Sequence, residues 1–152
     1  VIFPDNHDMS RIHTQLGDDV NKTRMALFFF ATMRGTPQFY YGTEVLMTNT
    51  GDDSHGNIRS DFPGGWLGDS RSGFSNRELS AESVAFQQEM RALLQWRKTA
   101  QAIHDGQLMH FVPEAGSYVY FRFNESQTFM VILNQSEEAE TLDLQRFDEV
   151  LQ

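Results

Sequence analysis

Four polar residues follow one another directly after a short apolar run at the start of the chain. The run ends at a proline, and Asp5, Asn6, His7 and Asp8 come next. A carboxylate beside an imidazole, with an apolar strand behind it, can have a shifted pKa and can hydrogen-bond vicinal hydroxyl groups. The alternative interpretation is that Asp5 and Asp8 cap the turn and that His7 is an ordinary loop residue.

The segments around this cluster indicate a parallel sheet. Residues 1–3 suit a strand buried on both faces, and residues 39–41 favour a second strand. Between them we expect a helix with Asp18 or Asp19 at its N-cap, whose C-terminal half is buried nearly all round. Strand, helix and strand in this order form a β/α unit. In a parallel barrel, the residues that follow each strand line the active-site mouth, so the polar cluster would lie there.

A long irregular segment and a second helix come next. Residues 43–77 are rich in Gly, Asp, Ser and Asn, and a loop of this length inside a compact domain is usually functional. The following helix is predicted to begin after Ser80, which caps it. One face of this helix carries four apolar residues, Phe86, Met90, Leu93 and Leu94.

The pattern changes to short strands after about residue 102. Three strand-like runs, 106–112, 117–123 and 128–134, are separated by short turn sequences, and residues 138–144 are a candidate fourth strand. Links this short favour antiparallel pairing. The sequence therefore predicts the tail of a β/α domain in residues 1–102, joined to the start of an antiparallel β-sandwich in residues 103–152.

Composition excludes several classes of partner and site. The net charge of −9 argues against a nucleic-acid-binding surface, which needs clustered Lys and Arg. The chain has no cysteine, so it has no disulfide, no thiolate nucleophile and no cysteine-ligated zinc. Its longest apolar stretch, Met25–Met33, is far shorter than the roughly 20 residues that span a bilayer. We therefore expect neither a nucleic acid nor a membrane as partner.

Two motifs, one helix apart, resemble the last two conserved strand regions of the α-amylase superfamily of glycoside hydrolases. In that family one strand ends in an Asn-His-Asp triplet, and the final barrel strand has the form Gly-x-Pro-x-x-x-x-Gly-x-Glu. Here the second motif is Gly35, Pro37, Gly42 and Glu44. The segment GNIRSDFPGGW, residues 56–66, is similar to the region after the eighth strand in the neopullulanase and cyclomaltodextrinase branch, in particular its Bacteroidetes-type members.

The resemblance implies both a fold and a set of site residues. The fold would be the last two β/α units of a (β/α)8 barrel followed by the start of a C-terminal antiparallel β-sandwich. Asp8 would be the third catalytic carboxylate, which hydrogen-bonds the sugar at the cleavage point and stabilises its oxocarbenium-like ring. His7, Asn6 and Arg59 would form the substrate-binding set: His7 contacts the same sugar, Asn6 holds the turn, and Arg59 reaches the glycan one or two units away.

Several loop residues have a second interpretation. Arg59 could instead brace the loop through a salt bridge with Asp61 or Asp53. Trp66 and Phe62 could offer stacking faces for glucose rings, or could pin the loop to the barrel.

The resemblance implies no cofactor. The acidic turn at residues 51–53 and the residue Glu44 are interpreted separately. His55 and the acidic turn at residues 51–53 raise a calcium hypothesis, but the turn lacks the regular spacing of a calcium loop, so calcium is not assigned and a solvated acidic turn is the alternative. Glu44 is interpreted as a structural residue that braces the last turn of the barrel.

Retaining glycoside hydrolysis needs two carboxyl groups about 5 Å apart, a nucleophile and a general acid. The family takes both from its fourth and fifth barrel strands, which the resemblance places upstream of Val1. We therefore expect a parent enzyme that cleaves α-glucosidic bonds in maltodextrins, cyclodextrins or pullulan, and an isolated chain that is inactive. The alternative is a non-catalytic carbohydrate-binding or domain-contact module.

The resemblance also implies partners and a compartment. The expected partners are an α-glucan oligosaccharide and the rest of the parent barrel. A second copy of the chain is the alternative cover for the sheet edges that two β/α units leave open. The Bacteroidetes-like resemblance implies a periplasmic or secreted enzyme.

Overall fold

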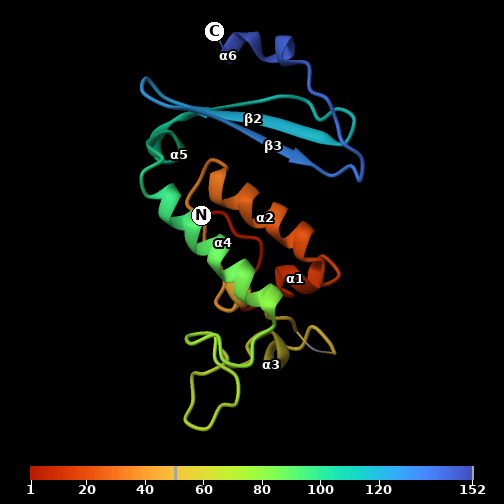
Figure 1. Ribbon diagram of the computed structural model, residues 1–152, viewed down its shortest axis with the longest axis vertical. Helices are drawn as coiled ribbons and strands as arrows, with labels where there is room; N and C mark the ends of the chain where they lie inside the picture. The colour runs from red at the N-terminus through yellow and green to blue at the C-terminus, as the bar shows by residue number, and fades with distance from the viewer. Residues whose placement is uncertain (50, 152) are drawn as a thin grey trace. The chain divides into compact units, whose positions relative to one another are not determined.

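The computed structural model describes residues 1–49 and 51–151 (Figure 1). The chain divides into two compact units. The first comprises Val1–Ala31 and Gly35–Trp96, and the second comprises residues 32–34 and 97–151. The domain boundary expected at residue 102 stays a prediction. No helix in the described part of the chain is long and apolar enough to cross a membrane.

The first unit begins with a single parallel bridge between Ile2 and Pro37. Two backbone hydrogen bonds of 2.9 Å flank it, from Ile2 N to the Thr36 oxygen and from Gln38 N to the Ile2 oxygen. The predicted parallel direction is confirmed. The two predicted strands are wrong as extended elements, because pairing stops at this bridge and residues 39–41 are irregular.

Helices account for most of the regular structure of the first unit. Their bounds are α1 Ile12–Gln15, α2 Val20–Thr32, the 3-10 turn η1 Thr43–Val45, α3 His55–Ile58 and α4 Ala81–Arg97. The carboxylate of Asp19 accepts the backbone N–H groups of Asn21 and Lys22 at 2.9 and 3.0 Å, which fixes the start of α2. Ser80 Oγ accepts Ser83 N at 3.0 Å at the start of α4. Both predicted caps are confirmed, with Asp19 rather than Asp18 at α2.

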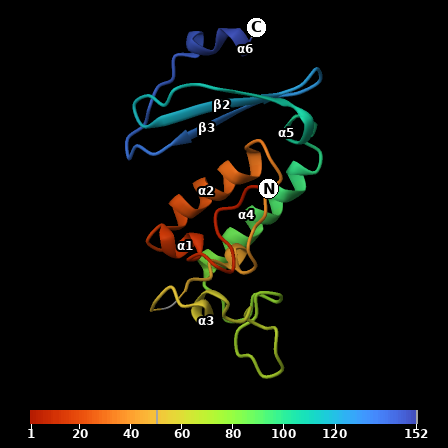
Figure 2. The same ribbon diagram turned by 180° about the vertical axis from the view of Figure 1, so that it is seen from behind.

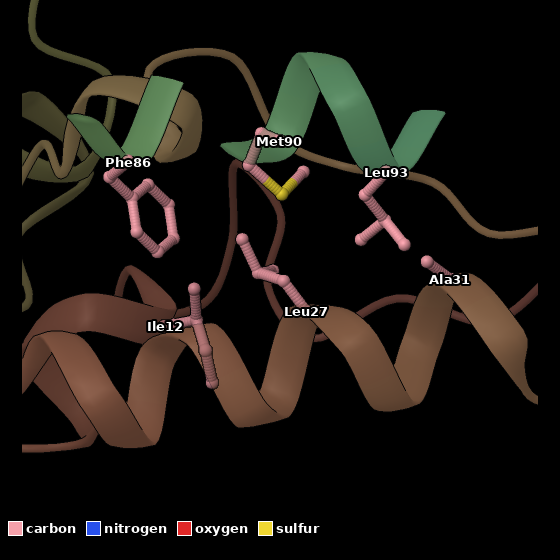
Figure 3. Packing of buried hydrophobic residues seen from close by; sticks show 6 residues of the cluster. All are labelled: Ile12, Leu27, Ala31, Phe86, Met90 and Leu93. Atoms are coloured by element: carbon pink, nitrogen blue, oxygen red, sulfur yellow. The ribbon is translucent and has the colours of Figure 1, made fainter. Parts of the chain in front are cut away.

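The core of the first unit lies between α2 and α4, which run side by side in Figures 1 and 2. Burying each large apolar side chain here contributes about 1.5–3 kcal/mol. The predicted burial of the C-terminal half of α2 nearly all round was wrong, because Phe28 is 38% exposed. The reason is that α4 covers one side of α2 rather than its whole circumference. Figure 3 shows the six core residues, Ile12, Leu27 and Ala31 facing Phe86, Met90 and Leu93.

The segment before α4, residues 62–79, is held largely by contacts within itself, and we call it the closed loop. The carboxylate of Asp69 accepts Gly64 N at 2.9 Å and Trp66 N at 3.1 Å. An isolated antiparallel bridge joins Ser72 to Arg77. Gly64 has φ +91°, and a Cβ there would lie 2.5 Å from Ser72 Oγ, so the turn requires glycine.

The second unit contains a three-stranded antiparallel sheet in the order β1-β2-β3. Its elements are α5 Gln101–Asp105, β1 Gln107–His110, β2 Ser117–Phe123, β3 Thr128–Asn134, the 3-10 turn η2 Leu144–Phe147 and α6 Asp148–Leu151. The three predicted strands and their antiparallel pairing are confirmed, with Gln107 opposite Phe123 and Tyr120 opposite Val131. The candidate strand at residues 138–144 is wrong, because this segment is irregular and the Asp143 carboxylate caps η2 by accepting Gln145 N at 3.0 Å.

Buried polar groups join strand β2 to the short segment 32–34 within the second unit. Arg122, which is 1% exposed, donates to the backbone oxygens of Thr32 and Gly106 at 3.0 and 3.1 Å. The Tyr120 hydroxyl lies 2.5 Å from Thr32 Oγ1, and burial raises the pKa of Tyr120 to about 12. Through these groups, strand β2 is attached to Thr32 by hydrogen bonds.

Candidate functional site

The four residues expected to form the site lie together. Arg59 Nη2 is 2.7 Å from Asp8 Oδ1, and Arg59 Nε donates to the backbone oxygen of His7 at 3.0 Å. His7 Nε2 is 3.1 Å from the other Asp8 oxygen. Asn6 Oδ1 accepts Asp8 N at 2.8 Å and so fixes the turn. Two segments about fifty residues apart in the chain thus build one polar cluster, whose catalytic and substrate-binding roles stay predictions.

The structure distinguishes between the two interpretations of Arg59. Its ion pair is with Asp8, and among the described residues no ion pair joins it to Asp61 or Asp53. The side chains of Arg59 and Asp8 are 44% and 56% exposed, so both remain accessible to a ligand. Arg59 follows α3 directly, and the buried side chain of Ile58 anchors that short helix. The described residues therefore contain the Arg59–Asp8 ion pair and not the alternative salt bridge of Arg59 with Asp61 or Asp53.

The loop that carries Asp8 is closed at its base by Asp5. Asp5 is fully buried, and its Oδ2 accepts Ile12 N at 2.9 Å and the Thr43 hydroxyl at 3.4 Å. The first bond joins the two ends of the loop, and the second joins the loop to η1. Burial raises the pKa of Asp5, while the nearby Arg11 opposes that change.

Arg11 is a second buried charge beside the same loop, at 1% exposure. Its Nη1 donates to the backbone oxygen of Tyr41 at 2.7 Å. Its guanidinium carbon lies 4.8 and 4.9 Å from the ring centroids of Tyr40 and Tyr41, a cation–π arrangement. Sequence reasoning missed Arg11 altogether. The available signal was its position, because Asp5 and Arg11 are opposite charges that flank the polar triplet.

The two aromatic residues of the closed loop differ in their surroundings. Phe62 packs on Phe74 with ring centroids 5.0 Å apart, and a Cβ on Gly73 would lie 2.5 Å from the Phe62 ring. Trp66 is 68% exposed. Phe62 therefore packs within the closed loop itself, while the Trp66 indole is open to solvent. The stacking and loop-pinning interpretations of both residues stay predictions.

Acidic residues near the site do not form a recognisable metal centre. Within residues 1–49 and 51–151, no group of three or more His, Asp or Glu side chains is arranged to hold a metal ion. The carboxylates of the acidic turn are engaged by protein groups: Asp52 accepts Ser54 N and Asn57 Nδ2, both at 2.8 Å, and Asp53 accepts Asn49 Nδ2 at 2.9 Å. The bracing role expected of Glu44, which lies in η1, stays a prediction.

Comparison with known proteins places this arrangement in a family. The family model described as the alpha amylase catalytic domain matches residues 1–128. The chain belongs to the alpha-amylase family. A second family model, the cyclo-malto-dextrinase C-terminal domain, matches residues 108–152. Together these matches confirm the predicted fold class, the C-terminal β/α part of the catalytic barrel followed by an antiparallel β domain.

Relatives in the alpha-amylase family act on related glucans according to their names. A maltogenic alpha-amylase of Bacillus acidopullulyticus is 31% identical over 86% of this chain, and a cyclomaltodextrinase of Geobacillus thermopakistaniensis is 28% identical over 88%. A cyclomaltodextrin glucanotransferase of Geobacillus stearothermophilus is 47% identical over a shorter stretch, 41% of this chain and 9% of its own length. The chain spans only 20% of the length of each of the first two relatives.

Solved alpha-amylase structures share the fold. The alpha-amylase from H. orenii superposes with a TM-score of 0.69 and 26% identity, over 87% of this chain and 29% of its own. The alpha-amylase of Geobacillus thermoleovorans, solved in complex with acarbose, gives a TM-score of 0.65 at 22% identity, over 90% of this chain and 27% of its own. Membership of this glycoside hydrolase family is thus supported by both sequence and structure.

Proposed function

We propose that this chain forms one wall of the active site of a retaining glycoside hydrolase that cleaves α-glucosidic bonds in maltodextrins, cyclodextrins or pullulan. The observation that carries the proposal is the ion pair of Arg59 with Asp8, 2.7 Å long, beside His7. A fixed carboxylate, an imidazole and a guanidinium on one exposed surface offer both acceptors and donors to sugar hydroxyls. The names of the relatives, and the acarbose complex of one structural neighbour, support an α-glucan as the ligand.

Asp8 acts as the third catalytic carboxylate in this proposal. Its oxygens accept hydrogen bonds from hydroxyls of the sugar at the cleavage point, and its negative charge stabilises the oxocarbenium-like transition state. Arg59 orients Asp8 through the ion pair that joins them. His7 offers its imidazole to the same sugar, and the Asn6 side chain holds the backbone of the turn through Asp8 N.

The isolated 152-residue chain is expected to lack hydrolytic activity. Retention needs a nucleophile and a general acid about 5 Å apart, and Asp8 in the role proposed here supplies neither. The chain matches only a fifth of the length of its maltogenic amylase and cyclomaltodextrinase relatives. Turnover therefore belongs to a longer polypeptide that carries the remaining carboxylates.

The test compares the full-length enzyme with the isolated chain. Both are incubated with maltoheptaose, γ-cyclodextrin and pullulan, and reducing ends are measured against a boiled control. We expect turnover by the full-length enzyme and none by the isolated chain. Full-length protein that binds these glucans without cleaving them would overturn the proposal in favour of a carbohydrate-binding module, and turnover by the isolated chain would overturn the assigned role of Asp8.

A further inference from the structure

Asn49 joins the two segments that carry Asp8 and Arg59. Its Oδ1 accepts Arg11 N and the Ser10 hydroxyl, both at 2.9 Å, just after the turn that carries Asp8. On its other side, Nδ2 donates to the backbone oxygen of Asp52 at 3.1 Å and to the Asp53 carboxylate at 2.9 Å. We propose that Asn49 is a positioning residue that sets the separation of Asp8 and Arg59; this inference rests on the function proposed for that pair.

The segment on the Nδ2 side leads directly to Arg59. The Asp52 carboxylate accepts Ser54 N and Asn57 Nδ2, so it fixes the start of the short helix α3. Arg59 is the residue that follows α3. A continuous set of hydrogen bonds therefore runs from the turn of Asp8, through the Asn49 amide, to the helix that presents Arg59, and the ion pair closes it into a ring.

The chemistry of the position requires an amide. The Asn49 residue is 5% exposed, and its side chain faces donors on one side and acceptors on the other. A backbone N–H, such as that of Arg11, can only donate, and a carboxylate such as Asp53 accepts, so a single orientation of the amide satisfies both. Asn49 N also donates to Thr14 Oγ1 at 3.1 Å, which holds the backbone of the bridge itself. An aspartate here would place two carboxylates side by side.

The ion pair needs such a support. Arg59 and Asp8 are both about half exposed, and an exposed ion pair contributes little to holding two segments together. The Asn49 side chain is itself buried, and its bond with Arg11 N is buried, where hydrogen bonds constrain geometry more strongly. The separation of the two charged groups is therefore set by the buried amide rather than by their own attraction.

The experiment uses four variants of the full-length enzyme and their combinations. Asn49→Asp is close to isosteric and removes the Nδ2 donors, while Asn49→Ser is neutral and too short to reach Asp53. We expect each to lower kcat on maltoheptaose about 10- to 100-fold, since small displacements of catalytic groups have effects of this size. Arg59→Met is the coupling partner, and Asn21→Asp, an exposed position on α2, is the matched control, expected to leave kcat within about twofold.

A double-mutant cycle separates positioning from general destabilisation. If Asn49 acts through Arg59, adding Asn49→Ser to Arg59→Met should lower kcat by less than about threefold further, because residues that act as a unit are not additive. Full additivity, or an Asn49→Ser variant with unchanged kcat, would overturn the inference. A crystal structure of Asn49→Ser gives a readout that does not depend on activity: we expect Asp8 and Arg59 to move out of hydrogen-bond distance, and an unchanged pair would also overturn it. If Asp8→Asn proves fully active, it is the proposed function that fails.

Discussion

Arg59 Nη2 lies 2.7 Å from Asp8 Oδ1, although the two residues are 51 positions apart in the chain. The contact brings a residue from the turn after the first parallel bridge next to one that follows α3. Because both groups are largely exposed, the pair presents a charged surface to an incoming ligand while each charge already has a partner. In the function proposed above, a neutral sugar would meet oriented donors and acceptors rather than an uncompensated charge.

Asp8→Asn in the full-length enzyme should lower kcat on maltoheptaose about 100-fold or more. The substitution removes the negative charge that stabilises the oxocarbenium-like transition state, a contribution of several kcal/mol. The melting temperature should change by less than about 2 °C, because an exposed ion pair adds at most about 1 kcal/mol. Steady-state kinetics and calorimetry measure the two effects. A fall in kcat of only a few fold would contradict the catalytic role.

Arg59→Met should lower kcat on maltoheptaose about 10- to 100-fold, as expected for Asn49→Ser, and should also raise KM. The free energy of unfolding should fall by less than about 1 kcal/mol, because the ion pair is exposed. The longer sugar chain loses a donor, and Asp8 loses the group that orients it. Arg59→Lys should recover only part of the loss, because an ammonium cannot contact both Asp8 and the His7 oxygen in the planar geometry of a guanidinium. Arg71→Met, which changes an exposed arginine of the closed loop, is the control and should leave KM unchanged.

Arg11→Met should destabilise the first unit by about 3 kcal/mol. The change leaves the Tyr41 oxygen without its donor and leaves the buried Asp5 carboxylate without a nearby cation, and removing one partner from a buried charged group costs about 3–5 kcal/mol. Arg24→Met is the control. It breaks a partly exposed ion pair with Glu89, 2.6 Å long, and should cost no more than about 1 kcal/mol. Thermal and urea unfolding would measure both, and equal losses would contradict this explanation.

His13 should make folding stability depend on pH near neutrality. The ring is 6% exposed, and burial lowers its pKa below the usual 6.5. The Thr23 hydroxyl donates its hydrogen to the backbone oxygen of Asp19 at 2.8 Å. His13 Nδ1 must therefore donate to the oxygen of that hydroxyl, also at 2.8 Å, so the neutral ring carries its hydrogen on Nδ1. The unfolded chain therefore binds more protons just below pH 6.5, and stability should fall as pH drops through that value.

The measurement for His13 compares urea unfolding at about pH 7.5 and about pH 5. If the unfolded chain binds one more proton than the folded chain, the free energy of unfolding falls by at most about 1.4 kcal/mol for each pH unit of acidification. The His13→Gln variant should show a smaller decrease than the wild type over this range. His104→Gln, at an exposed histidine, is the matched control and should follow the wild type. Equal slopes for wild type and His13→Gln would show that this histidine does not contribute.

Local chemistry made part of this structure predictable. Asp19 and Ser80 are short polar residues directly before apolar periodic segments, so both helix starts could be assigned from the sequence. The three short strand-like runs within residues 106–134, and the turn residues that link them, likewise predicted the antiparallel sheet. Asp8 and Arg59 were assigned to the site from the Asn-His-Asp triplet and the segment 56–66 rather than from periodicity, and their ion pair was not predicted.

Tertiary packing decided what the sequence did not reveal. The guanidinium of Arg11 lies against the rings of Tyr40 and Tyr41, which are close to it only after folding. The apolar pattern of α2 could not tell which side would meet α4, so the exposure of Phe28 was unforeseen. Residues 138–144 were a candidate fourth strand, but the cap formed by Asp143 turns the chain into η2 instead.

The closed loop gives the site a part that can vary independently. Because Asp69 and the Ser72–Arg77 bridge hold the loop through its own backbone, few of its internal bonds depend on the turn of Asp8. Insertions or exchanges between residues 64 and 77 would therefore alter the surface around Trp66 while leaving the Asn49 bridge and the charged pair in place. The architecture separates a region free to diversify from Asn49 and residues 51–59, whose hydrogen bonds hold the charged pair in place.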